Sequence, residues 1–470
     1  MGFIKHFFAE YKDERVKMQL FNLLNGIAIP VYGETFDISL NWIGNLIRLL
    51  ITGVGSVGVG VILFSVILRV IVLPFDVYQR IAMRKQNLKM KENQARMEKL
   101  QKQYANNKDM YNQKVMEIYR ESGISMFSSC LPMILSLVIF IVAINAFTAY
   151  SQYSNIENYN MMVKAYNQEL TSYCADLDNG ASVSDNGTII TVSQDGKHIY
   201  YEVAMPTDGT DYTADGYAYV KNAKKSYYID GDAARADAEI QAALGENLSD
   251  DNALKGYFTS KAQDAVVESY NGEVSQKTKF LWIKNVWVTD ASYKHPILNY
   301  SEFKTEVERE EFSVNGNKVS LNGVTEHTDV YTEGVYNVVT AKLDTAKNAA
   351  NGYFILIALS IGTILLQQFV SMRSQKEQQK YSSVDGQGAS QQKMMLVIMT
   401  GMFAIFSFMY SAAFSMYMIM SNVLSLGSTL VINKLVDMSE SKKEEKALQE
   451  KYNKRFPGRN ANNQKKSDKK

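Results

Sequence analysis

The chain has 470 residues, a formal net charge of +1 and a mean hydropathy of −0.19, averages that would suit a soluble protein of several domains. Its two cysteines and four histidines are scattered without metal-ligand spacing, and it has no glycine-rich phosphate loop or nucleophile motif. These features favour neither an enzyme nor a metal or cofactor site. The averages nevertheless hide long runs without any charged residue.

The first part of the chain, residues 1–50, is balanced in charge and lacks the pattern of a cleaved signal peptide. Its end, Ile38–Leu50, has apolar residues at helical spacing together with Trp42 and Arg48. This pattern predicts an amphipathic helix that lies on the membrane surface just before the first span.

Five segments are long and apolar enough to cross a bilayer as helices, which takes about 20 residues. Core helices of a soluble protein would need runs of only roughly 10 to 14 residues. The sequence therefore predicts an all-α integral membrane protein. The expected spans are 51–76, 126–150, 351–372, 393–411 and 414–434.

Between the first two spans, residues 77–125 are predicted to form a helical hairpin. A helix without Gly or Pro runs to Ala105, an Asn-rich turn follows, and a second helix, Met110–Glu121, precedes Gly123 at a C-cap position. Its excess of Lys and Arg indicates the cytoplasmic side. The hairpin is either a solvated connector or a contact element at the mouth of a membrane site.

Alternation of the spans then sets the topology. The N-terminus and residues 151–350 are expected outside the cell, and the loop 373–392 and the basic tail 435–470 inside. Within the outer segment, about 151–279 look like an inserted extracellular α+β domain. Its expected strands are Thr188–Val192 and His198–Val203, and its expected helices are Asp232–Leu244 and Asp251–Val267.

Arg69 interrupts the first span, five residues before Pro74. It is shallow enough to snorkel toward the cytoplasmic interface. The alternative is an arginine facing the bundle interior, where an unpaired charge costs about 2.5 to 3.5 kcal/mol. An interior arginine needs polar neighbours on other spans, and the sequence offers Thr363, Gln367, Gln368, Ser421 and Asn422.

Six blocks occur in a fixed order: FSVILRVIVLP (64–74), KVMEIYRESGIS (114–125), Cys130-Leu131-Pro132, FLWIKNVWVTD (280–290), LLQQF (365–369) and SMYMIMSNVLS (415–425). In this order they resemble the YidC-type membrane protein insertases in their Gram-positive form. The resemblance covers roughly 35–150 and 280–440. The chain departs from the family at Ser128-Ser129 (usually a glycine pair), at Met399-Thr400 (usually a proline) and in its longer outer segment.

The resemblance implies a five-helix core around a hydrophilic groove that is open to the cytoplasm and lipid and closed to the outside. In it Arg69 would attract acidic residues of a substrate's outer segment, beside the polar residues named above. The third and fifth spans would guide the substrate's own span, through Leu365, Met416, Tyr417 and Met420. For the methionines, lipid contact or core filling is an equal alternative.

The implied partners are nascent membrane proteins, with the ribosome and the general secretion channel as further candidates around a monomeric core. The tail would contact either ribosomal RNA or anionic lipid, through Lys454, Arg455, Arg459, Lys465 and Lys466. The expected location is a bacterial cell membrane, with the N-terminus outside and the C-terminus in the cytoplasm.

Two other functions fit parts of the sequence. A channel or transporter that uses Arg69 would be expected to show paired internal repeats and several intramembrane charges. A membrane-anchored extracellular receptor or scaffold would instead use the outer segment as its working part.

Overall fold

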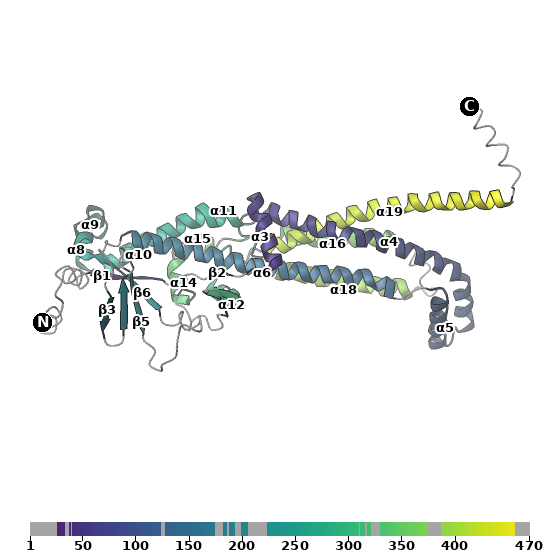
Figure 1. Cartoon of the computed structure of the whole chain (residues 1–470), viewed down its shortest axis with the longest axis horizontal. Helices are drawn as coiled ribbons and strands as arrows, with labels where there is room; N and C mark the ends of the chain where they lie inside the picture. The colour runs from purple at the N-terminus through teal and green to yellow at the C-terminus, as the bar shows by residue number, and fades with distance from the viewer. Residues whose placement is uncertain are drawn as a thin grey trace, which may run out of the picture. The chain divides into compact units, whose positions relative to one another are not determined.

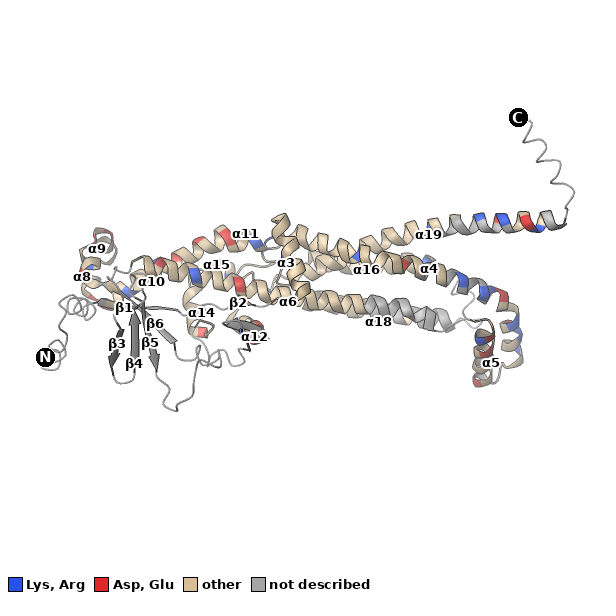
Figure 2. Ribbon diagram, viewed as in Figure 1, with Lys and Arg blue, Asp and Glu red and all other residues tan. Residues whose placement is uncertain are grey.

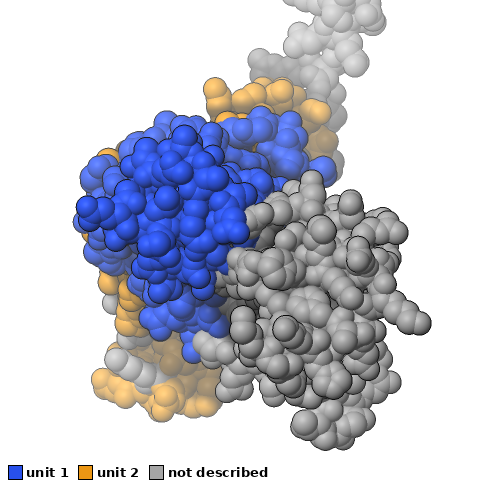
Figure 3. Space-filling view, turned by 90° about the vertical axis from the view of Figure 1, so that its left-hand side faces the viewer, with its two compact units in different colours: residues 1–57, 146–353 blue, residues 58–145, 354–470 orange. Residues whose placement is uncertain are grey.

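The computed structural model describes residues 26–32, 37–38, 40–123, 127–173, 182–185, 188–192, 199–204, 223–309, 311–314, 317–320, 330–374 and 387–455. The chain divides into two compact units. Unit 1 comprises residues 1–57 and 146–353, and unit 2 comprises 58–145 and 354–470 (Figure 3).

Long helices dominate the described chain (Figure 1). Among the described residues, three helical stretches are long and apolar enough to cross a membrane, namely Val57–Tyr78, Ile355–Arg373 and Ala412–Leu435. The prediction of a mainly helical membrane protein is therefore confirmed. The other two expected spans lie on helices some of whose side chains fall outside the described residues.

Unit 2 contains the long helices with apolar stretches and one short polar helix. They are α4 (Val57–Gln103), α5 (Lys108–Glu121), the first part of α6 (Phe127–Ser172), α16 (Ile355–Ser374), α18 (Gln387–Met409) and α19 (Ala412–Arg455). The Phe140 ring of α6 lies 4.7 Å from that of Phe403 on α18 and 5.7 Å from that of Phe414 on α19, centroid to centroid. These ring contacts connect three of the helices.

The first span begins later than the sequence suggested. Helix α3 (Trp42–Val54) runs through residue 51, with Asn41 as its N-cap, and it ends at Gly55, whose φ is +71°. Glycine adopts this left-handed conformation without a Cβ clash, so it ends the helix efficiently. As predicted, α3 is amphipathic, with Ile43 and Ile47 buried and Trp42 exposed.

The hairpin consists of the second half of α4 and α5. Met90 and Met97 on α4 and Ile118 on α5 are buried, although both helices are otherwise polar. The Asn93 side chain donates a hydrogen bond to Ser122 Oγ at 2.7 Å. Gly123 follows the second helix with φ +61°, as its predicted C-cap role requires.

Unit 1 contains two antiparallel sheets and the remaining helices. The larger sheet has the order β1-β6-β5-β4-β3, and the smaller has the order β2-β7-β8. The strands predicted in residues 188–203 are present with nearly the predicted bounds. The strands are β1 (Gly26–Val31), β2 (Asp37–Ile38), β3 (Ser182–Asp185), β4 (Thr188–Val192), β5 (Ile199–Ala204), β6 (Ala223–Asp230), β7 (Glu311–Val314) and β8 (Asn317–Ser320).

The core of unit 1 is helical. Helix α6 continues to Ser172, far beyond the expected span end at 150, because apolar residues recur every three or four positions. These buried residues are Ile156, Tyr159, Val163, Tyr166 and Leu170. The other helical elements of the unit are α8 (Gly231–Ala236), α9 (Ala238–Leu244), η1 (Gly245–Ser249), α10 (Asp251–Ser269), η2 (Tyr270–Val274), α11 (Ser275–Thr278), α12 (Tyr300–Arg309), α14 (Glu333–Val339) and α15 (Asp344–Lys347).

Residues 279–299 form a segment without regular secondary structure, and its middle part, 285–291, is buried. Asn285 donates through its side chain to the Pro296 carbonyl at 2.9 Å, and its backbone N–H donates to Asn351 Oδ1 at 2.8 Å. Asp290 accepts from the backbone N–H of Tyr353 at 2.7 Å. We call Asn285, Asp290 and Asn351 the asparagine hub.

Candidate functional site

A row of polar side chains runs between α4, α16 and α19 in unit 2. On α19, Asn422, Ser425 and Ser428 are three residues apart, so they lie along one face of the helix. On α16, Thr363 and Gln367 are four residues apart and also share a face. We call these five residues and Arg69 the polar ladder.

Each rung of the ladder is a hydrogen bond between two helices. Asn422 Nδ2 donates to Thr363 Oγ1 at 3.4 Å, and Gln367 Nε2 donates to Ser425 Oγ at 2.9 Å. Arg69 Nη2 donates to Ser428 Oγ at 2.8 Å. Along α19 from its N-terminal end, the first two rungs connect it to α16 and the third connects it to α4.

Arg69 forms an ion pair on its own helix. Its Nη2 donates to Asp76 Oδ2, and the two side chains are 15% and 24% exposed. Seven residues correspond to nearly two helical turns, so both side chains lie on one face of α4. The guanidinium charge is therefore neutralised within the first span.

One donor of Arg69 is left over. Its Nε is buried and has no hydrogen-bond partner among the described residues. A buried donor without a partner costs about 1 to 3 kcal/mol, and more when it is charged. The edge of the guanidinium that carries Nε therefore favours an incoming acceptor, and a carboxylate matches it best.

The structure brings together most of the residues that the sequence pointed to, with different partners. Gln367 contacts Ser425 instead of Arg69, and Gln368 is half-buried beside it on α16. Ser421 is half-buried next to the Tyr417 side chain, which is itself within electrostatic reach of Arg69. Three of the five residues expected near the arginine, Thr363, Gln367 and Asn422, thus belong to the polar ladder, whereas Gln368 and Ser421 lie outside it.

Sequence reasoning missed three members of the site: Asp76, Ser425 and Ser428. The signals were present, because Asp76 follows Arg69 at heptad spacing and the two serines continue the three-residue period that starts at Asn422. Serine is also a common packing residue in spans, which is why its spacing alone is a weak signal.

The residues expected to guide a substrate's span differ in exposure. Leu365 is 49% exposed, and Leu366 and Phe369 are exposed near it on α16. Met416 and Tyr417 are buried, at 4% each, and Met420 is half-buried. Of the four residues expected to guide a substrate's span, Leu365 on α16 is thus exposed, whereas those on α19 are buried or half-buried.

Charged residues are unevenly distributed along the long helices. Figure 2 shows them gathered in the C-terminal halves of α4 and α19, whereas the N-terminal halves are almost free of charge. The tail residues expected to contact RNA or lipid cannot be placed in this pattern. Lys454 and Arg455 lie at the end of α19, but their side chains are outside the described part of the structure. Arg459, Lys465 and Lys466 lie entirely outside the described residues.

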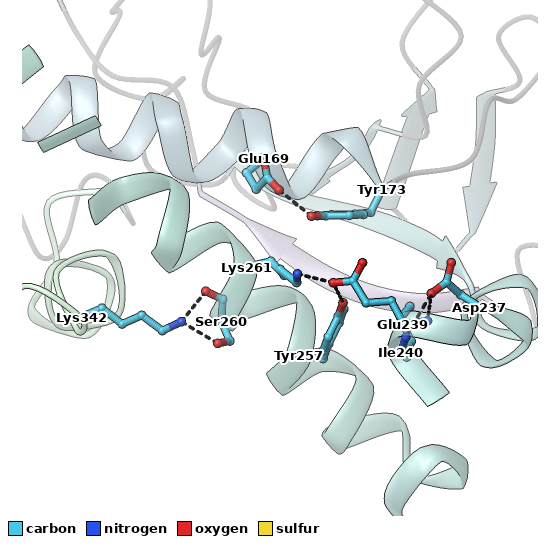
Figure 4. A network of polar contacts seen from close by, with 9 residues as sticks. All are labelled: Glu169, Tyr173, Asp237, Glu239, Ile240, Tyr257, Ser260, Lys261 and Lys342. Atoms are coloured by element: carbon cyan, nitrogen blue, oxygen red, sulfur yellow. Dashed lines mark hydrogen bonds and ion pairs between the residues drawn. The ribbon is translucent and has the colours of Figure 1, made fainter. Parts of the chain in front are cut away.

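A second polar cluster lies at the surface of unit 1, around α9 and α10 (Figure 4). Lys261 Nζ donates to Glu239 Oε1 at 2.6 Å, and Tyr257 donates to the same oxygen at 3.1 Å. The hydrogen bond to Glu239 raises the pKa of Lys261, and the lysine holds the pKa of that carboxyl below its usual range. Such exposed pairs contribute little to the free energy of folding. We therefore interpret the cluster as a contact that orients α9 on α10.

Comparison with known proteins assigns most of the chain to a family. The family model described as 60Kd inner membrane protein matches residues 49–190 and 269–444, more than half of the chain. Both matched stretches together contain Arg69 and all the other ladder residues. The unmatched stretch between them falls inside the segment 151–279 that the sequence marked as an insert.

Three relatives are each named membrane protein insertase YidC. That of Caldanaerobacter subterraneus subsp. tengcongensis is 38% identical over 98 residues, 21% of this chain and 46% of the relative. That of Fusobacterium nucleatum is 36% identical over 86 residues, 18% of this chain and 40% of the relative. That of Treponema pallidum is 27% identical over 143 residues, 30% of this chain and 21% of the relative.

These alignments span less than half of the length of each relative, and no solved structure matches the chain. The family model, in contrast, covers both stretches of sequence that contain the six blocks resembling the insertases. The chain therefore belongs to the 60Kd inner membrane protein family, with YidC-type membrane protein insertases as its relatives.

Proposed function

We propose that this chain is a membrane protein insertase of the bacterial cell membrane. The observation that carries the proposal is Arg69, a cation inside the first span that lies in the polar ladder and whose buried Nε has no partner among the described residues. Nascent membrane proteins whose outer segments contain acidic residues would be its substrates.

The physical role of the arginine follows from its surroundings. Moving a carboxylate into a bilayer is costly, because the charge loses its hydration. Arg69 offsets part of that cost, since opposite charges attract more strongly where the local dielectric constant is low. In this proposal the polar ladder lines a hydrophilic groove open to the cytoplasm, and Thr363, Gln367 and Asn422 provide hydrogen bonds to the passing polar chain.

The remaining parts of the chain complete the proposal. The substrate's own span would leave along the apolar face of α16 near Leu365 and Phe369, supported from α19 by Met416, Tyr417 and Met420. The α4–α5 hairpin would receive the substrate on the cytoplasmic side, where the basic tail would contact the ribosome or anionic lipid. The N-terminus and the α+β insert would lie outside the cell, and the core would work as a monomer, alone or beside the secretion channel.

The test is rescue of cells depleted of their own insertase. We expect the full chain to restore insertion of a small membrane protein with an acidic outer tail. Arg69→Ala should lower this insertion by roughly tenfold or more, because hydrogen bonds to charged groups contribute about 1.5 to 3 kcal/mol. Arg69→Glu should be at least as defective, and Arg69→Lys less so.

Two controls make the result specific. The same substrate with its acidic tail residues changed to amides should depend much less on Arg69. Arg373→Ala removes an exposed arginine at the end of α16 and should behave as the unaltered chain. Failure of the chain to rescue any substrate would contradict the insertase function, and full activity of Arg69→Glu on the acidic substrate would remove the role of the arginine.

A further inference from the structure

The ion pair between Arg69 and Asp76 poses a problem for an arginine that recruits acidic substrates. Asp76 already holds Nη2 of the guanidinium, from the same face of the same helix. A carboxylate arriving from outside therefore meets a cation whose charge is largely cancelled. The Nε of the same guanidinium is buried and lacks a partner in the described part of the chain.

The geometry of the guanidinium makes the two carboxylates competitors. Nε and Nη2 lie on one edge of the planar group, and a carboxylate binds such an edge best with both oxygens. A substrate carboxylate can accept from Nε at once, but it gains the second hydrogen bond only when Asp76 releases Nη2. Asp76 is 24% exposed, so water can solvate it after release and the exchange is not prohibitively costly.

We propose that Asp76 is a specificity-determining residue, an internal carboxylate that occupies Arg69 and that an acidic substrate has to displace. It sets a threshold: a substrate tail with one acidic residue competes poorly, whereas several acidic residues compete well because the local concentration of carboxylate is higher. The proposal rests on the insertase function of the same site and adds the selection of substrates by their acidity.

The ion pair also affects the site before a substrate arrives. With Asp76 bound, Arg69 does not leave an unpaired positive charge within the span between two substrates, which would otherwise be costly. Ser428 is uncharged, and its hydroxyl oxygen accepts a hydrogen bond from Nη2, which holds the guanidinium toward α19. The ion pair thus makes the site electrically neutral in the absence of a substrate and leaves Nε of Arg69 available to donate to a substrate carboxylate.

The experiment compares insertion of substrates that differ only in carrying none, one or three acidic residues in the outer tail, in insertase-depleted cells supplied with the full chain. Asp76→Asn should raise insertion of the one-acid substrate by roughly two- to fivefold, the effect of removing a partly exposed ion-pair competitor. Insertion of the acid-free substrate should stay as it is. Asp76→Ser removes the same carboxylate with a different side chain and should act alike, which covers the case of a poorly folding amide variant.

A double-mutant cycle locates the effect. In an Arg69→Gln background the Asp76→Asn change should give no gain, because the competition needs the guanidinium. Glu92→Gln, which removes an exposed carboxylate farther along α4, serves as the matched control and should leave the acid dependence unaltered. All levels of insertion are normalised to the amount of insertase in the membrane.

The outcomes separate the two proposals. If Arg69→Glu inserts the three-acid substrate as well as the unaltered chain does, the role of the arginine in the proposed function is wrong. If Arg69→Glu is defective but both Asp76 variants show the same acid dependence as the unaltered chain, competition by Asp76 is wrong while the insertase function stands. A gain of equal size with and without the guanidinium also overturns the competition.

Discussion

The asparagine hub of unit 1 consists of fully buried polar side chains, whereas the polar side chains of the ladder in unit 2 are mostly half-buried, and their hydrogen bonds are arranged differently. In the hub, Asn351 is fully buried, and its side chain donates to the carbonyls of Asn285 and Thr289 while accepting a backbone N–H. In the ladder, Arg69 keeps a buried N–H that has no partner among the residues the structure describes. A buried donor with all its partners inside the protein stabilises a fold, whereas one left over is available to a ligand.

The elements that carry the two regions differ in the same sense. The hub connects a segment without secondary structure, whose backbone groups need side-chain partners once they are buried. The ladder connects helices whose backbone groups already bond within each helix. Its side chains can therefore exchange their hydrogen-bond partners for groups of a bound substrate chain. We therefore expect mutations in the hub to lower stability and mutations in the ladder to lower activity.

The largest effect on stability is expected for Asn351→Ala. It removes the partners of several buried backbone groups at once, so unit 1 should lose on the order of 2 to 4 kcal/mol of stability. Thermal unfolding and limited proteolysis of the detergent-solubilised chain would measure this. Asn348→Ala, an exposed asparagine bonded to Asp344, is the matched control and should cost little. Equal stability of the two variants would contradict the distinction between hub and ladder.

A smaller loss is expected for Gly352→Ala. A Cβ at this position would lie 1.8 Å from Asp290 Oδ1 and 3.0 Å from its Cα, so the hub has to shift. Overpacking of this kind costs about 1 to 3 kcal/mol. Gly362→Ala on α16, where a Cβ meets nothing within 4 Å, should be neutral or stabilising, because alanine favours a helix. The comparison uses the same unfolding measurement, and a stable Gly352→Ala chain would show that the hub tolerates movement.

The smallest effect on stability, with a measurable effect on insertion, is expected for Ser428→Ala. It removes one of the hydrogen bonds that hold the Arg69 guanidinium, a contribution of about 1 kcal/mol. Insertion of the acidic-tailed substrate should fall several-fold while the unfolding temperature changes little. Thr429→Val removes a neighbouring hydroxyl of similar depth as a control. A large loss of stability with unchanged insertion per folded molecule would place Ser428 with the structural residues.

Much of the helical framework was predictable from local patterns. The uncharged runs gave the three spans that the described helices bear out, and the Asn-rich turn and Gly123 gave the limits of the hairpin helices. These features depend on hydropathy and on caps within a few residues, so a single sequence carries them. The start of the first span was placed too early because Gly55 acts through its backbone conformation, which apolar character does not reveal.

Other features depended on contacts between distant residues. Nothing local in FLWIKNVWVTD marks Asn285 as a hub residue, because its backbone N–H is bonded to Asn351, which lies far away in the sequence. The continuation of α6 to Ser172 is written in its apolar period, but that period becomes a helix because α10 and other elements cover it.

The sequence by itself determined that this chain is a mainly helical membrane protein with an arginine in its first span and polar residues on the third and fifth. Hydropathy and charge are properties of single residues, so they can be read without a fold. The tertiary structure decided which polar residues meet: Arg69 pairs with Asp76 and Ser428, while Gln367 and Asn422 pair with other residues. Such pairing depends on the rotation and depth of each helix, and packing between helices sets both.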